Sequence, residues 1–247
     1  MKKNVIKNSD EKFVGFYPET YKFFENLKKN NNKIWFDKHR EEYETFVLEP
    51  VKKFILSIKG FFNYINTELI VEPKFNKSLV RINNDMRFAK IPYKEYFLAN
   101  FGRFKWDSAL YLFLQDESIS LGCFVNQAKK TDSLFNINVN QDRERFISVC
   151  EEYNISKKYK IEDLKGVQTF TTHKFNPVKD FDKILATDWI TIDKPYLPDN
   201  KRVYSSKFLE DALIIFNNLY PLFIYATSTN LDQDLKNYRD KIGKILK

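Results

Sequence analysis

The sequence predicts a single α+β domain with N-terminal helices, a central, mainly antiparallel sheet and C-terminal helices. Apolar residues recur every three or four positions near both ends of the chain, which is the helical period. In the middle they recur at every second position, which is the period of a strand. The 247 residues contain no internal repeat and no Gly/Ser-rich linker. We expect one domain over residues 13–228, with polar terminal extensions at 1–12 and 229–247.

Two helices are predicted in the first quarter of the chain. Pro18, followed by Glu19, is typical of a helix start, and the run Asn30–Asn32 ends this helix. The second helix follows, because nine apolar residues keep the spacing of one buried face: Trp35, Phe36, Tyr43, Phe46, Val47, Val51, Phe54, Ile55 and Ile58. We expect Pro50 to kink or split this helix, since proline has no amide hydrogen to donate.

The middle of the chain predicts the sheet. Residues 80–88 alternate between apolar and polar side chains, which indicates a strand with one buried and one solvated face. The apolar set is Val80, Ile82, Met86 and Phe88, and the polar set is Arg81, Asn83, Asp85 and Arg87. Residues 110–114 and 119–125 predict two further strands, joined as an antiparallel hairpin.

The second half of the chain predicts shorter elements and one long helix. In chain order these are a helix at 140–153, a helical piece at 161–165, β-like runs at 169–172 and 189–192, a helix from 208 to about 226, and a charged helical tail at 230–247. Ser205 or Ser206 opens the long helix, and we expect Pro221 to bend it.

Composition excludes several classes of site. The six glycines lie too far apart for a P-loop, a dinucleotide-binding turn or a GxSxG nucleophile elbow. Two histidines cannot build a three-His metal site, and His173 has no readable partner for a role as general base. Two cysteines are too few for a disulfide framework, so Cys123 and Cys150 are expected to be packing residues. We predict no metal site, because the acidic pair Asp180 and Asp182 is typical of a solvated loop.

The chain is expected to be cytoplasmic, without membrane attachment. Its longest apolar stretch, residues 212–226, contains polar residues and is shorter than the roughly 20 residues that a bilayer span needs. The basic N-terminus lacks the apolar region of a secretory signal. No cofactor and no oligomeric state follow from the sequence.

Positive charge is concentrated in one segment. The formal net charge is +8. The 33 Lys outnumber the 8 Arg, and this excess of Lys is typical of an AT-rich genome. Codon usage therefore explains part of the positive charge. Residues 74–105 contain eight Lys and Arg against two acidic residues, a charge of +6. The few arginines in this segment are more informative than the lysines, because a guanidinium group can bind an anion through two parallel hydrogen bonds.

These residues predict a binding site on the solvated face of the strand at 80–88. The site would hold an anionic, phosphate-bearing ligand or nucleic acid, since arginine forks suit phosphate and interleaved aromatic rings suit unpaired bases. Its predicted members are Arg81, Asp85, Arg87, Tyr93, Lys94 and Arg103.

Other interpretations of the same residues remain open at this stage. Asp85, with other carboxylates, would suit a metal-dependent phosphoester hydrolase. Exposed aromatic residues would suit a protein-interaction adaptor without catalysis. A further interpretation is that Arg81, Asp85 and Arg87 form exposed ion pairs on a solvated sheet face. Each such pair contributes ~1 kcal/mol or less to stability. The sequence therefore leaves open whether the protein is an enzyme.

Two groups of residues resemble the signatures of one family. The first group is Asn30-Asn31, Trp35-Phe36 and Tyr43, within the stretch Phe24–Lys59, and the second is Arg81, Asp85-Met86-Arg87-Phe88 and Pro92-Tyr93-Lys94. Together they resemble the uncharacterised family called domain of unknown function 2461, over roughly residues 13–228. The resemblance implies a shared fold and no catalytic residues. The chain departs from the family at Asn84, where a further Arg is usual, and in a shorter loop at 89–91.

Overall fold

The computed structural model describes residues 12–105, 107–128, 133–163 and 172–245. Within them the helical elements are α1 (Pro18–Lys29), α2 (Lys33–Lys38), α3 (Arg40–Tyr43), the π-helical turn η1 (Glu44–Leu48), α4 (Glu49–Ile65), α5 (Leu134–Gln141), α6 (Arg143–Glu152), α7 (Phe181–Ala186), the 3-10 turn η3 (Lys201–Tyr204), α8 (Lys207–Thr227) and α9 (Leu231–Ile245). The strands are β1 (Phe97–Phe101), β2 (Ala109–Leu114), β3 (Ile119–Asn126), β4 (Lys160–Asp163), β5 (Thr172–Lys174) and β6 (Trp189–Tyr196).

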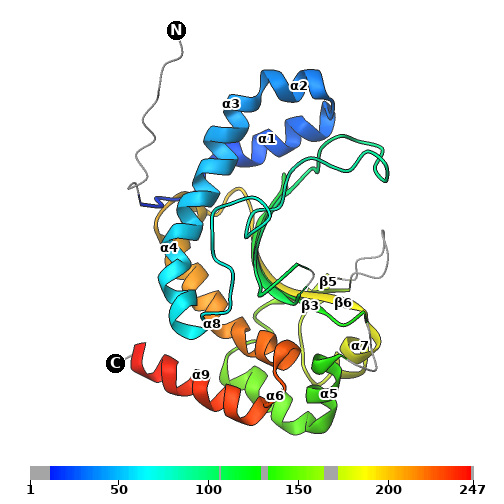
Figure 1. Ribbon diagram of the computed structural model, residues 1–247, viewed down its shortest axis with the longest axis vertical. Helices are drawn as coiled ribbons and strands as arrows, with labels where there is room; N and C mark the ends of the chain where they lie inside the picture. The colour runs from blue at the N-terminus through cyan, green and yellow to red at the C-terminus, as the bar shows by residue number, and fades with distance from the viewer. Residues whose placement is uncertain (1–11, 106, 129–132, 164–171, 246–247) are drawn as a thin grey trace.

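The six strands form one sheet with helices before and after it, so the predicted α+β class is confirmed (Figure 1). The strand order is β1-β2-β3-β6-β4-β5, and all neighbours pair antiparallel. The hairpin predicted at 110–125 is confirmed as β2 and β3.

The sheet is curved, and its two faces have different neighbours (Figure 1). Helices α4 and α8 lie along the convex side, where α8 packs against β2 and β3. Alternate residues of the strands point into this apolar core, among them Phe101, Leu112, Leu121 and Ile192, each at most 1% exposed. The other alternate residues point to the concave side, where several of them are polar.

The helical chain passes Pro50 without splitting. Pro50 cannot donate to the carbonyl one turn earlier, that of Phe46, and the hydroxyl of Thr20 on α1 donates to this carbonyl at 2.7 Å. The turn immediately before the proline widens into η1, which continues directly into α4. A hydroxyl from a neighbouring helix thus replaces the hydrogen bond that proline removes.

The same solution occurs at Pro221. Helix α8 runs through this proline to Thr227, and the carbonyl left without an amide donor is that of Asn217. The hydroxyl of Tyr238 on α9 donates to it at 2.8 Å. Helix α9 also confirms the predicted helical tail, and it packs against α8 through buried side chains that include Leu235.

Some sequence expectations differ from the structure. The helical piece predicted at 161–165 is wrong at residues 161–163, because they end β4 and Ile161 pairs with Ile192 of β6. Residues 164–165 lie outside the described residues. The helix predicted at 140–153 is confirmed as α6 but begins later, since the side chain of Asp142 caps α6 by accepting the amide of Arg145 at 2.9 Å. Residues 140–141 end the separate helix α5. Residues 169–171 of a predicted β-like run lie outside the described residues, and residue 172 begins β5.

Two further expectations concern burial and membrane contact. Cys123 and Cys150 are fully buried free thiols whose pKa values burial raises, as expected for packing residues. Within the described ranges, no helix has both the length and the hydropathy that crossing a bilayer requires.

Candidate functional site

Most of the predicted site residues lie on an irregular hairpin between α4 and β1, residues 81–94, which we call the basic hairpin. Its two arms are joined by backbone hydrogen bonds from Asn84 to Pro92, at 2.8 Å, and from Lys94 to Ile82, at 2.7 Å. Figure 1 shows this hairpin in teal, extending beside α1 and α2. It contains an isolated bridge and no continuous strand.

Asp85 closes the tip of the basic hairpin, and the strand predicted at 80–88 is therefore wrong. Its carboxylate accepts the backbone amide of Arg87 at 3.1 Å, which is a turn that aspartate favours. The Arg87 side chain pairs with the same carboxylate, with Nε–Oδ1 at 2.9 Å and Nη2–Oδ2 at 2.6 Å. Met86 and Phe88, predicted to be buried, are 56% and 87% exposed.

Arg81 is an exposed cation at the start of the basic hairpin. Its guanidinium carbon lies 5.5 Å from the ring centroid of Phe75. Among the described residues, no carboxylate forms an ion pair with it. Arg81 is thus an exposed cation that lies beside an aromatic ring.

Tyr93 and Lys94 fix the base of the hairpin. The Tyr93 ring is 5% exposed and stacks on Phe36 with the centroids 4.0 Å apart, while the Asn31 side chain bonds the amide and the carbonyl of Tyr93. Lys94 Nζ donates to two backbone carbonyls of residues 81–83 at 2.8 and 2.7 Å, and burial lowers its pKa. Both residues position the hairpin through these contacts.

Arg103 lies outside the hairpin, directly after β1. Its Nε donates to Asp107 at 2.8 Å, and its guanidinium lies 6.0 Å from the ring centroid of Phe223 on α8. The hydrogen bond that the guanidinium donates to Asp107 raises the pKa of Arg103. The structure therefore places Arg81, Asp85 and Arg87 on one hairpin and gives Arg103 a separate structural contact.

The concave face of the sheet carries a second polar cluster, which the sequence analysis missed. Tyr111, Gly122 and Asp193 are register partners on β2, β3 and β6. The Tyr111 hydroxyl crosses Gly122 and donates to Asp193 Oδ2 at 2.8 Å. A Cβ at position 122 would lie 2.6 Å from both Tyr111 Cζ and Asp193 Cβ, so only glycine leaves room for this pair.

Burial sets the protonation of this pair. Asp193 is 8% exposed, and desolvation raises the pKa of its carboxyl to about 7, although the hydrogen bond from Tyr111 lowers it. Desolvation also raises the pKa of Tyr111. Within the described part of the chain, no Lys or Arg forms an ion pair with Asp193. A carboxyl that exchanges its proton near neutral pH is typical of functional sites.

One sequence signal could have identified this cluster. Gly122 interrupts an otherwise buried, side-chain-rich strand, and such a glycine often marks a close approach. Asp193 falls with Thr191 on the polar side of the alternation in β6, so the sequence gives no sign of its burial. The glycine does not name the partner either, because the contact depends on the register of three strands.

His173 has the partner that the sequence did not reveal. Its Nε2 lies 2.6 Å from Asp180 Oδ1, and Asp180 Oδ2 accepts the amide of Asn176 at 2.7 Å. Asp180 is only 6% exposed, so the prediction that it solvates a loop is wrong, whereas Asp182 is exposed. These bonds hold the turn before α7 against β5.

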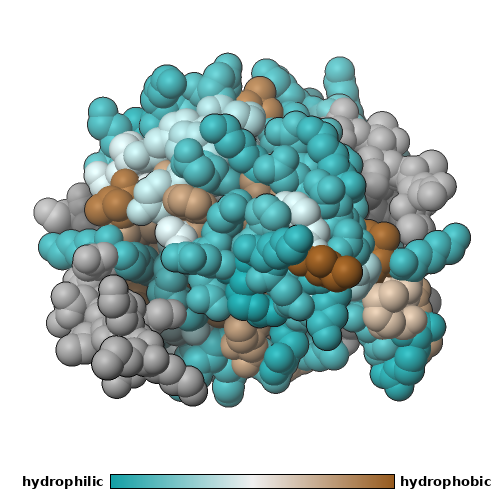
Figure 2. Space-filling view, turned by 90° about the horizontal axis from the view of Figure 1, so that it is seen from above, coloured by the Kyte–Doolittle hydropathy of each residue, from teal (hydrophilic) through white to brown (hydrophobic). Residues whose placement is uncertain are grey.

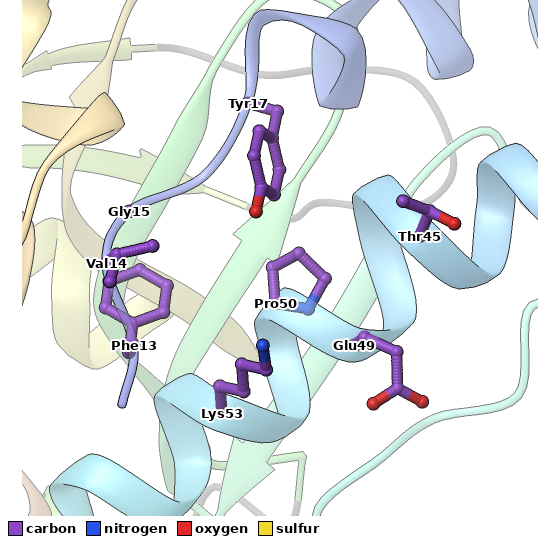
Figure 3. A pocket seen from close by; sticks show the side chains of 8 residues that line it. All are labelled: Phe13, Val14, Gly15, Tyr17, Thr45, Glu49, Pro50 and Lys53. Carbon is purple, nitrogen blue, oxygen red and sulfur yellow. The ribbon is translucent and has the colours of Figure 1, made fainter. Parts of the chain in front are cut away.

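A small pocket lies between the extended segment before α1 and the start of α4 (Figure 3). It is lined by Phe13, Tyr17, Thr45 and Pro50, among other residues. Its volume is about 40 Å³, which holds a few water molecules and is far below the size of a typical small-molecule site. We therefore do not assign a ligand to it.

Carboxylates are not gathered into a metal site in the described ranges: no group of three His, Cys, Asp or Glu residues there could hold an ion. Asp85 in particular is engaged by Arg87.

Comparison with known proteins gives a family match. A family model described as conserved hypothetical protein, DUF2461, matches residues 19–225. The matched range begins in α1, ends in α8, and includes the basic hairpin and the whole sheet. No curated protein and no solved structure gives a significant match.

Proposed function

Because the chain belongs to the family of conserved hypothetical proteins DUF2461, whose description states no activity, we propose a function from the site: the protein binds single-stranded nucleic acid on the basic hairpin. The observation that supports this proposal is the exposed tip. Phe88 is 87% exposed, and the Arg87 guanidinium carbon lies 5.5 Å from its ring centroid. An exposed ring beside an arginine provides a surface on which a base stacks while the cation meets the phosphate.

The positive charge of the hairpin and of the segment before it supports the same proposal. Lys74, Lys77, Arg81, Arg87 and Lys90 are all exposed. They lie within the segment whose formal charge is +6. Phosphate groups attract such a surface without any requirement for base sequence, so we expect binding with little sequence preference, in the cytoplasm.

The alternative functions have less support. A hydrolase would need carboxylates near Asp85, and the hydrogen bonds of Asp85 go to Arg87. An adaptor would need a large apolar patch, and Figure 2 shows a mostly hydrophilic face on which hydrophobic residues form small, separate patches.

Fluorescence anisotropy with a labelled oligo-dT strand tests the proposal. With about four phosphate contacts, the logarithm of the binding constant should fall with the logarithm of salt concentration at a slope of about −3. Arg81→Ala combined with Arg87→Ala should weaken binding about tenfold and leave the melting temperature unchanged.

A matched control separates this site from net charge. Lys201→Ala combined with Lys207→Ala removes the same charge from exposed positions near the start of α8. Equal weakening by the two double variants, salt-independent binding, or no binding at low salt would each contradict the proposal.

A further inference from the structure

The basic hairpin ends in a short loop, residues 85–91, which carries more exposed apolar surface than the proposed function uses. The loop is closed by the hydrogen bond from Asn84 to Pro92, at 2.8 Å. Its large apolar side chains are all exposed, at 56%, 87% and 39% for Met86, Phe88 and Ile91. We propose that this loop packs against the terminal base pair of a duplex, so that the protein prefers the junction between a single strand and a duplex. This inference rests on the proposed function of the hairpin and names its substrate class.

The apolar part of the loop is larger than a single base requires. One unpaired base stacks on one aromatic ring, and Phe88 supplies that ring. Met86 and Ile91 would stay in water beside such a ligand, although the removal of apolar surface from water is what favours a contact of this kind. A terminal base pair presents the faces of two bases side by side and offers room for further side chains. The size of the apolar loop therefore favours a base pair over a lone base.

Hydrogen bonds hold the loop in one shape. The amides of Phe88 and Ala89 both donate to the carbonyl of Asp85, at 2.9 and 3.1 Å. The Asn84 side chain donates to the carbonyl of Ile91 at 3.0 Å. A loop that is already ordered loses little conformational entropy when it binds. The end of a duplex is also ordered before binding, whereas a free single strand has to be ordered on the protein.

The positions of the cations suit both parts of a junction. Arg87 and Lys90 lie in the loop itself and are exposed, so they can meet the phosphates next to the terminal base pair. Arg81 lies at the start of the hairpin, away from the loop, and suits the single strand that continues from the duplex. A junction is thus the ligand that uses the apolar loop and the cations together.

A membrane of anionic lipids also combines apolar and negatively charged groups. Insertion of the loop would carry charged groups toward the hydrocarbon, because Arg87 lies between Met86 and Phe88 in the chain and pairs with Asp85 at 2.6 Å. This ion pair is exposed in the free protein, and transfer of charged groups out of water is costly. The open end of a duplex leaves both groups in water. The observations therefore favour nucleic acid.

Fluorescence anisotropy with three labelled DNA probes tests the inference on the natural chain. The probes are an oligo-dT strand, a blunt-ended stem-loop, and a stem-loop with an oligo-dT overhang, all with the same number of nucleotides and at the same salt concentration. We expect the overhang probe to bind about tenfold more tightly than either of the other two. Equal probe length ensures that the number of phosphates does not explain the difference.

A variant of the loop assigns the preference. Met86→Ala combined with Ile91→Ala removes apolar surface and keeps Phe88 and every cation. This double variant should reduce the preference for the overhang probe to about twofold or less and leave oligo-dT binding unchanged. Leu197→Ala combined with Ile214→Ala is the matched control, because both side chains are 54% exposed and lie outside the hairpin. The control should keep the full preference.

The outcomes separate this inference from the proposed function. Equal affinities of the natural chain for oligo-dT and for the overhang probe would overturn the inference and leave the proposed function intact, and this comparison needs no variant. A preference that persists in the folded loop variant, or that the control variant loses equally, would also overturn it. Binding to phosphatidylserine vesicles that the loop variant loses, without a preference for the overhang probe, would identify the loop as a membrane contact instead. No binding of oligo-dT at low salt would overturn the proposed function, and the inference with it.

Discussion

Two aspartates in this protein each accept a hydrogen bond from one neighbouring side chain, yet their pKa values shift in opposite directions. Asp85, at the exposed tip of the basic hairpin, has a lowered pKa because Arg87 donates to it. Asp193, on the concave face of the sheet, has a pKa raised to about 7 because burial outweighs the hydrogen bond from Tyr111. The comparison teaches that the surroundings of a carboxyl, rather than the presence of a hydrogen bond, decide its charge at neutral pH.

The largest expected effect is on the pH dependence of stability. The pKa of Asp193 is higher in the folded than in the unfolded state, so the unfolded chain loses this proton first as the pH rises. Asp193 therefore lowers the free energy of unfolding between about pH 4 and pH 7, by about 4 kcal/mol at most, and has no further effect above pH 7. Urea denaturation of the natural chain and of Asp193→Asn should show the variant gaining stability relative to the natural chain over this range. A constant difference would mean that Asp193 is ionised in the folded state.

The next effect tests the space between the strands. Gly122→Ala places a methyl group 2.6 Å from Tyr111 Cζ and from Asp193 Cβ, so the ring or a strand has to move. We expect a loss of about 3 kcal/mol in the free energy of unfolding, measured by urea denaturation. Gly243→Ala, whose added methyl group meets open space, is the control and should be no less stable than the natural chain. Equal effects of the two substitutions would show that Tyr111 does not cross β3 at this point.

A smaller effect isolates the hydrogen bond itself. Tyr111→Phe keeps the ring and removes the hydroxyl that donates to Asp193. Because this bond lowers the pKa of Asp193, its loss should raise that pKa further, and stability at pH 8 should fall by about 1 to 2 kcal/mol. Carboxyl titration and thermal denaturation measure the two effects, and an unchanged pKa would contradict the assignment.

The smallest effect is expected at the exposed aspartate. Asp85→Ala removes the partner of Arg87 in full contact with solvent, so the melting temperature should not change measurably. The substitution frees the Arg87 guanidinium and should strengthen oligonucleotide binding. A clear loss of stability would show that the Asp85 turn supports the hairpin, and the comparison with Asp193 would then need revision.

The helices and the β2–β3 hairpin could be predicted because their signals are local. Apolar spacing, Pro18 and the asparagine run define the N-terminal helices, and two buried strands separated by a short polar turn define the hairpin. The basic hairpin was mispredicted as a strand because the chain turns back after Asp85 and pairs Asn84 with Pro92, and the alternation of neighbouring residues gives no sign of this pairing.

The predicted site residues were only partly brought together for a related reason. The type and charge of these residues could be read from the sequence. Arg81 and Arg87 are exposed cations in the structure, as a binding surface for an anion requires. The roles of Tyr93 and Lys94 as supports depend on contacts with Asn31 and with carbonyls across the hairpin. The Tyr111–Asp193 pair joins residues 82 positions apart, and only the strand order brings them together.

The hydroxyl groups that replace proline hydrogen bonds have a consequence for the order of assembly. Helix α8 emerges from the ribosome before α9, so the Asn217 carbonyl has no protein donor until Tyr238 has been synthesised and docked. The corresponding donor for the carbonyl before Pro50 is Thr20, which is made first and is already present when α4 forms. One long helix is thus complete as it is made, whereas the other is completed only by the segment that follows it.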